Sequence, residues 1–307
     1  MKTLLLHGMH GMGDNIHQRA IIRRLMLRYE RIILETSWPC IYHDLPVTFL
    51  FKGTNLRTQS KNALRERDKF FAGPIPTPHD ELRVWYPPRE VRRCRSVLRA
   101  MAAGVGLPER EPLDFRLPIP AEWTERARRA LGYVWDAPKP IMLFRPLVER
   151  TEWGGCSARN PDWRTYAELY ESIRERFFVV AVADLVEGRE WSVGLPFEAD
   201  AYFMRGELPF EVTAALTRRA SMVFCSPGFA AVLGQSVGTP VACVFGGYES
   251  GYSFSSGSKF APYLPIEPIQ PCECFRHDHD CSKQIDATAF GAIGSFALES
   301  AARPRRD

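Results

Sequence analysis

Residues 3–28 read TLLLHGMHGMGDNIHQRAIIRRLMLR, and this stretch decides the fold that we expect for the start of the chain. A short apolar run, Thr3–Leu6, leads into a turn with glycines at positions 8, 11 and 13, and a helix-like stretch follows from Asn15 to Leu27. Ligands of α/β proteins bind at such strand-to-helix junctions. Glycine lets backbone N–H groups approach a phosphate or a sugar closely, and the helix adds the positive end of its dipole. We therefore predict that Asp14, the carboxylate of this turn, is placed for chemistry.

Two common nucleotide-binding motifs do not fit this turn. It lacks the Lys-Ser/Thr ending of a phosphate-binding NTPase loop, and its glycines do not match the G-x-G-x-x-G dinucleotide spacing. That spacing disfavours a nicotinamide-dependent oxidoreductase with Glu35 as its ribose-binding acid. A purely structural alternative is that Asp14 caps the helix, as aspartate often does.

The composition indicates a globular protein with room for two domains of ordinary size. The chain has 307 residues, 45% of them hydrophobic, and a net charge of +4. Arginine is concentrated in one segment, at positions 83, 89, 92, 93, 95 and 99. This segment indicates either an anionic partner, nucleic acid included, or a solvated helix face.

The sequence predicts a cytoplasmic protein without a transmembrane segment. No stretch approaches the roughly 18 apolar residues that span a bilayer, and Leu4–Leu6 run into the glycine turn without a cleavage-like site. The eight cysteines show no disulfide-framework spacing, so we expect reduced thiols.

Short apolar runs alternate with helical patterns along the chain, which predicts an α/β fold with mostly parallel sheets. The expected strands are 3–7, 31–36, 47–52, 81–86, 140–144, 177–184, 201–204, 221–225 and 240–245. The expected helices are 15–28, 88–103, 122–131, 163–176, 209–220, 229–237 and 287–299. Residues 104–120, rich in glycine and proline, are predicted to be a linker. Two such series predict two sheet domains facing a central cleft, where ligands bind at the C-terminal ends of strands.

Two segments carry a resemblance to a known family. Residues 11–25, GMGDNIHQRAIIRRL, are similar to the N-terminal motif of glycosyltransferase family nine, the ADP-heptose:lipopolysaccharide heptosyltransferases. Residues 208–220 resemble the helix before that family's donor-binding strand. Residues 226–246, SPGFAAVLGQSVGTPVACVFG, resemble its glycine turn, helix, Gly-Thr-Pro and Phe-Gly ending. The cysteine cluster beyond residue 270 is a weaker match.

The resemblance implies a GT-B-like architecture of two Rossmann-like domains. We expect an N-terminal acceptor-binding domain over residues 1–132 and a C-terminal nucleotide-sugar-binding domain over residues 133–286. Residues 287–307 are expected to form a helix and a basic tail that packs back on the N-terminal domain. The implied activity is inverting, metal-independent transfer of a hexosyl or heptosyl group from a nucleotide-diphosphate sugar to a hydroxyl of a saccharide or lipid-linked glycan.

The resemblance also implies roles for individual residues. Asp14 matches the family's proposed general base, which takes the proton of the acceptor hydroxyl. The acceptor-binding residues expected around it are Gly11, Gly13, His10 and His17. The donor-binding residues expected at the strand ends of the second domain are Arg145, Arg159, Asp184, Ser226, Gly228 and Phe229. At 226–231 the chain departs from the family's Asp-Ser/Thr-Gly-x-x-His pattern, so we expect the backbone amides near Gly228 to hold the diphosphate.

A second cluster has the chemistry of a metal site. Cys272, Cys274, His277, His279 and Cys281 fall within ten residues, and thiolate and imidazole groups suit tetrahedral zinc. We predict a structural zinc ion there, with reduced surface thiols as the alternative, and no cofactor for catalysis.

Two other functions fit the same residues. The arginine-rich segment with Trp85 and Tyr86 could face nucleic acid, which would make the protein a glycosyltransferase that acts on modified DNA bases. The missing acid and imidazole at 226–231 instead favour a non-catalytic nucleotide-sugar-binding protein.

Overall fold

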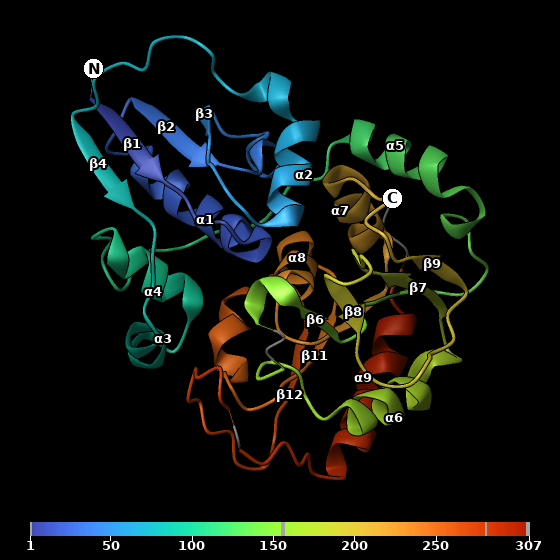
Figure 1. Ribbon diagram of the computed structural model, residues 1–307. Coiled ribbons are helices and arrows are strands. Elements are labelled where there is room, and N and C mark those ends of the chain that lie inside the picture. The colour runs from blue at the N-terminus through green and yellow to red at the C-terminus, as the bar shows by residue number, and fades with distance from the viewer. Residues whose placement is uncertain (1, 155–156, 280, 305–307) are drawn as a thin grey trace. The chain divides into compact units, whose positions relative to one another are not determined.

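The computed structural model describes residues 2–154, 157–279 and 281–304, which form two compact units, Met1–Pro118 (unit 1) and Ile119–Asp307 (unit 2). The side chain of Trp153 also lies outside the described part. Figure 1 shows a sheet flanked by helices in each unit. Within the described residues, every helix is too short or too polar to cross a lipid bilayer.

Unit 1 is built on a parallel sheet with the strand order β3-β2-β1-β4. The strands are β1 (Thr3–His7), β2 (Arg31–Thr36), β3 (Thr48–Phe51) and β4 (Asp80–Arg83). The first helix, α1 (Met12–Leu25), buries Ile16, Ala20 and Ile21 completely, which matches the apolar spacing of an amphipathic helix. The chain therefore forms β1, turns at its glycines and covers the sheet with α1, as the sequence predicts.

The remaining helices of unit 1 are α2 (Arg57–Arg65), α3 (Pro88–Cys94) and α4 (Val97–Gly104), with short 3-10 turns η1 (Pro39–Tyr42) and η2 (Arg67–Lys69). The prediction of one helix over 88–103 is wrong. Arg95 has a left-handed backbone, with φ at 52°, and ends α3. Ser96 then starts α4, because its hydroxyl accepts the N–H of Arg99 at 3.2 Å.

Residues 104–120 are packed rather than extended as a linker. Leu113, Phe115 and Leu117 are buried, and the Arg19 side chain donates to the carbonyl of Arg116. Apolar side chains at alternate positions thus attach the segment to its own unit.

Unit 2 is built on a six-stranded parallel sheet with the order β12-β11-β10-β5-β7-β9. The strands are β5 (Ile141–Phe144), β7 (Phe178–Val182), β9 (Ala201–Phe203), β10 (Met222–Cys225), β11 (Val241–Val244) and β12 (Tyr263–Ile266). A small antiparallel pair, β6 (Val148–Arg150) and β8 (Glu190–Ser192), stands beside the main sheet. The helices are α5 (Ala121–Leu131), α6 (Trp163–Arg174), α7 (Phe210–Arg219), α8 (Phe229–Val237) and α9 (Thr288–Ala301), with 3-10 turns η3 (Gly132–Val134), η4 (Thr151–Trp153) and η5 (Gly251–Gly257).

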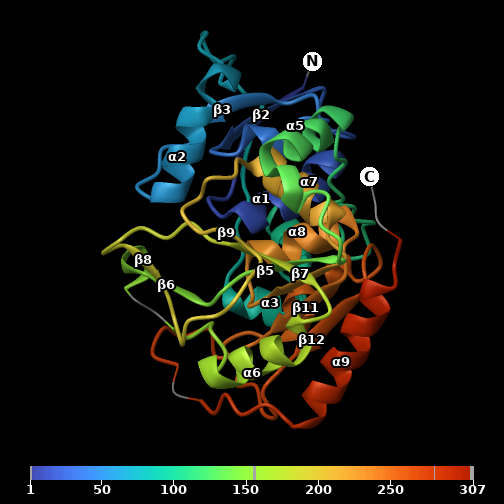
Figure 2. The ribbon, with the colours of Figure 1, turned by 90° about the vertical axis from the view of Figure 1, so that its right-hand side faces the viewer.

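Helices at both ends of unit 2 pack on its own elements. Helix α5 lies against α7, where Trp123 meets Phe210 edge to face at 6.1 Å, so the units divide at Pro118 rather than at the expected residue 132. Helix α9 lies beside α6 and buries Ile293 and Ala297 in the core of unit 2 (Figure 2). The sequence predicted α9, whereas α2, β12 and the β6–β8 pair were not predicted.

Candidate functional site

The sheet of unit 2 reverses its strand order between β5 and β10. From β5 the chain adds β7 and β9 on one side and β10, β11 and β12 on the other. Parallel α/β sheets bind ligands at the carboxyl ends of the two strands that flank such a reversal. Arg145 follows β5 and Ser226 follows β10, so both expected donor residues lie at this edge.

Arg145 is a buried cation at the reversal. Its guanidinium donates to the carbonyl of Val182 at 2.9 Å and lies 5.5 Å from the ring centre of Phe229, the first residue of α8. Burial is the main cause that lowers the pKa of Arg145, but an arginine keeps its charge in proteins. The structure therefore brings together Arg145 and Phe229, two of the residues expected to bind the donor.

A buried carboxylate binds this cation together with a second one. Glu190 lies 3.4 Å from Arg145 and 3.0 Å from Arg150, and its side chain is 3% exposed. Pairing of β6 with β8 sets Arg150 directly opposite Glu190. Two guanidinium groups share one carboxylate, so this pair of interactions leaves one positive charge at the edge of the sheet.

The glycine turn after β10 is open above the start of α8. Gly228 precedes the helix with φ at 152° and ψ at −158°, a conformation that glycine adopts readily. A Cβ atom built at Gly228 would meet no atom within 4 Å. There is thus open space beside Gly228 at the start of α8, next to Phe229 and Arg145, where the helix dipole favours an anion.

The other two expected donor residues lie at neighbouring strand ends. Asp184, which follows β7, is half-buried, and its charge acts on Arg145. Arg159 binds Glu249 with N–O distances of 2.7 and 2.6 Å, in the loop after β11. The backbone of Asn160 passes so close to Gly246 that a Cβ there would lie 2.3 Å from the Asn160 carbonyl oxygen. Arg159 therefore lies with the β11 loop rather than with Arg145.

In unit 1 the strand order reverses between β1 and β4, and Asp14 lies at that point. Asp14 is the third residue of α1, and Gly11 is the N-cap, so Asp14 is not the capping residue of the structural alternative. The hydroxyl of Tyr86, from the segment after β4, donates to Asp14 Oδ1 at 3.0 Å. A Cβ at Gly11 would lie 2.5 Å from Asp14 Oδ2, so glycine at this position makes room for the carboxylate.

A buried polar network holds the turn that presents Asp14. Asn15 donates to the carbonyls of Met9 and Gly11 at 2.8 and 2.7 Å. Its own amide oxygen accepts the hydroxyls of Thr36 and Tyr42, both at 2.8 Å. A satisfied network of this kind fixes a single loop geometry.

The expected acceptor residues separate into two groups. His10 is half-buried in the turn with Gly11 and Gly13, and the pKa of its imidazole is lowered by burial and by the charge of Lys52. His17 instead lies in the core of unit 1, edge to face against Phe115 at 4.8 Å. Burial lowers the pKa of His17 to about 3. His17 points away from any surface where an acceptor could reach it, because α1 turns it toward the packed 104–120 segment.

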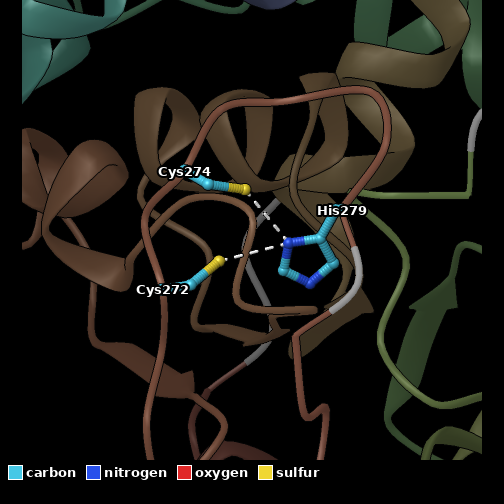
Figure 3. Close-up of side chains that lie close together, drawn as sticks. All are labelled: Cys272, Cys274 and His279. Atoms are coloured by element: carbon cyan, nitrogen blue, oxygen red, sulfur yellow. Dashed lines mark hydrogen bonds between the residues drawn. The ribbon is translucent and has the colours of Figure 1, made fainter.

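Three of the five candidate metal ligands converge. Figure 3 shows the sulfur atoms of Cys272 and Cys274 directed at His279, whose Nδ1 lies 3.2 Å from each. The three ligand atoms all lie within 4.8 Å of one another. His279 Nε2 contacts the carbonyl of Gly246 at 3.0 Å, which orients the ring and leaves Nδ1 for a metal. Two thiolates and one imidazole fit zinc or iron, whereas His277 and Cys281 are exposed and stand outside this group.

No protein-family model matches the sequence, and no curated protein matches it. Several solved structures do align with the chain. A family 9 glycosyltransferase from Veillonella parvula aligns over 97% of this chain and 98% of its own, with 14% identity and a TM-score of 0.61. The ADP-heptose lipopolysaccharide heptosyltransferase II of E. coli aligns over 97% and 99%, with 14% identity and a TM-score of 0.60. The iron-containing, dodecameric glycosyltransferase TibC of enterotoxigenic E. coli aligns over 97% and 74%, with 13% identity and a TM-score of 0.57.

The chain has the fold of the family 9 glycosyltransferases. The predicted fold class is therefore confirmed, and so is the resemblance on which it was based. Residues 11–25 form the turn and α1, and residues 208–246 form α7, β10, α8 and β11 in the implied order. Identities of 13 and 14% establish the fold alone, so the roles of single residues in this family 9 fold stay predictions.

Sequence reasoning missed three contacts of the candidate sites. Tyr86 reaches Asp14 across 72 positions, and Glu190 reaches Arg145 across 45. Glu249 binds Arg159 from 90 positions away. Tyr86 could have been found by asking which residues directly follow the strand beside β1, but that requires the strand order. The two carboxylates, Glu190 and Glu249, have no local sequence pattern that would have revealed their partners.

Proposed function

We propose that this protein is an inverting, metal-independent glycosyltransferase that uses a nucleotide-diphosphate sugar and a hydroxyl acceptor. One observation carries the proposal: in each unit the candidate residues lie where the strand order reverses, Asp14 beside β1 and β4, and Arg145 beside β5 and β10. The structurally similar TibC was crystallised in complex with ADP-D-β-D-heptose, which supports a nucleotide sugar as the donor.

The proposed reaction is a single displacement. The acceptor hydroxyl oxygen attacks the anomeric carbon while Asp14 takes its proton, and the bond from that carbon to the diphosphate oxygen breaks with inversion. Negative charge then grows on the leaving diphosphate. The guanidinium of Arg145 and the first-turn amides of α8 are the groups that stabilise it.

A donor screen and one substitution test this proposal. A nucleotide sugar that binds the native chain raises its melting temperature. At a hundredfold excess over Kd it raises the free energy of unfolding by about 2.7 kcal/mol. Asp14→Asn should keep that shift and lose about 10²- to 10⁴-fold in sugar transfer. The matched control is Asp68→Asn, whose carboxylate is 93% exposed. Donor binding without transfer by the wild type would favour the non-catalytic binding protein.

The acceptor class is a saccharide or a lipid-linked glycan in this proposal. A modified DNA base is the competing acceptor, since Arg83, Arg89 and Arg92 are exposed. Nucleic-acid binding that weakens steeply with salt would support the DNA acceptor.

We also propose that Cys272, Cys274 and His279 hold a structural zinc ion. Zinc supplies folding energy in such sites and takes no part in the transfer. The site would fix the loop after β11, because His279 and Cys272 contact the carbonyls of Gly246 and Gly247. Metal analysis of the purified chain tests this; iron, which TibC contains, would replace the zinc assignment.

A further inference from the structure

The segment after β4 leaves the sheet of unit 1 directly beside the Asp14 turn. Val84 is buried, and its N–H donates to the carbonyl of His7, the last residue of β1, at 3.0 Å. The next two residues are Trp85 and Tyr86. Trp85 and Tyr86 thus lie just beyond the end of β4, at the point where the strand order reverses.

Tyr86 contacts the candidate base itself. Its phenol donates to Asp14 Oδ1 at 3.0 Å. A hydrogen bond donated to a carboxylate favours the ionised form, which is the form that accepts a proton. It also fixes the direction of the carboxylate, so that the second oxygen, on the side of Gly11, keeps one orientation.

Trp85 extends this contact into a surface. Its ring stacks on Tyr86 at 6.3 Å between ring centres with 26° between the planes, and Trp85 is 59% exposed. The backbone beneath it packs closely on α4, because a Cβ at Gly104 would lie 2.7 Å from the Trp85 carbonyl oxygen. Such a large aromatic face open to solvent is suited to contact a ligand.

We propose that Tyr86 is a positioning residue for Asp14, and that Trp85 and Tyr86 form the wall on which a sugar ring of the acceptor stacks. A pyranose presents an apolar C–H face and hydroxyl groups around its rim, so one sugar can cover the aromatic wall and offer a hydroxyl to Asp14. This inference rests on the proposed function and narrows its acceptor to a saccharide. Tyr86 affects catalysis through Asp14, whereas Trp85, which is 59% exposed, supplies the larger part of the wall and so of the affinity for the acceptor.

Two variants with matched controls test the two roles separately. The probes are the donor found in the screen and a panel of methyl glycosides as acceptors. For Tyr86→Phe we expect kcat/KM to fall about tenfold, with the acid limb of its pH profile moved to higher pH. For Trp85→Ala we expect KM for the acceptor to rise about tenfold with kcat nearly unchanged. The controls Tyr133→Phe and Leu64→Ala, both exposed and remote in sequence, should match the wild type.

A measurement without turnover checks the contact. In protein labelled with ¹³C at tyrosine Cζ, the Tyr86 signal, identified by its loss in Tyr86→Phe, should move in Asp14→Asn. An unmoved signal would refute the positioning role. An active wild type whose Tyr86→Phe pH profile and Trp85→Ala acceptor KM are unchanged would overturn the inference while the proposed function stands. Transfer to a DNA oligonucleotide but to none of the glycosides would overturn the saccharide acceptor, and a wild type that transfers no sugar at all would remove both proposals.

Discussion

Replacing Glu190 by glutamine should destabilise unit 2, because it removes the charge shared by two arginines. The Glu190 side chain is 3% exposed, and those of Arg145 and Arg150 are 10% and 15% exposed. Glutamine keeps the size and one acceptor oxygen. The substitution therefore tests the charge and not the packing.

The expected magnitude follows from the burial of the three groups. Removing one partner of a buried ion pair costs about 3–5 kcal/mol, because the other charge stays buried. Arg145 keeps the Val182 carbonyl and the Phe229 ring as partners, so the lower end, about 3 kcal/mol, is the better expectation. In a unit of this size each kcal/mol lowers the melting temperature by about 2–4 °C, which gives a fall of about 6–12 °C.

The assay is thermal unfolding of the full chain, followed by circular dichroism, against the control Glu187→Gln. Glu187 lies on the same β7–β8 connection but is exposed, so its substitution should stay within about 0.5 kcal/mol of the wild type. Inorganic pyrophosphate should raise the melting temperature of Glu190→Gln more than that of the control, since an anion replaces the missing charge. A Glu190→Gln variant as stable as the control would refute the reasoning.

Three further predictions concern His17, Gly11 and the candidate metal site. The pKa of His17 is about 3 in the folded chain against an ordinary 6.5, so only the unfolded chain binds a proton there between these pH values. The free energy of unfolding should therefore fall by about 1.4 kcal/mol for each pH unit as the pH is lowered from 6.5 to 3. In urea unfolding at pH 7 and 5, His17→Phe should lack this His17 contribution to the loss of stability. Gly11→Ala places a Cβ 2.5 Å from Asp14 Oδ2 and should lower sugar transfer about 10²-fold, whereas Gly53→Ala, where a Cβ meets no atom within 4 Å, should leave transfer unchanged. A chelator should lower the melting temperature of the wild type but not of Cys272→Ser; equal shifts would contradict the metal site.

The elements with strong local patterns were predicted correctly from the sequence. The apolar run, three glycines and helical spacing of residues 3–28 gave β1, the turn and α1. The FFVVAVAD run became β7, buried at every position but its first, Phe178. The failures were local conflicts that tertiary contacts resolved: Arg95 takes a left-handed backbone inside a helical pattern, and a proline-rich segment buries Phe115.

The sequence by itself determined the βα alternation and the position of Asp14 in the first turn of a helix, because hydrophobic period and glycine placement act over a few residues. Only the tertiary structure decided which strands are neighbours, and so where the order reverses. That order brings Tyr86 to Asp14 and Glu190 to Arg145. It also gathers three of the five candidate metal ligands and buries His17. The contacts of Tyr86 with Asp14 and of Glu190 with Arg145 join residues whose separation along the chain carries no pattern, since hydrogen bonding and charge pairing act through space.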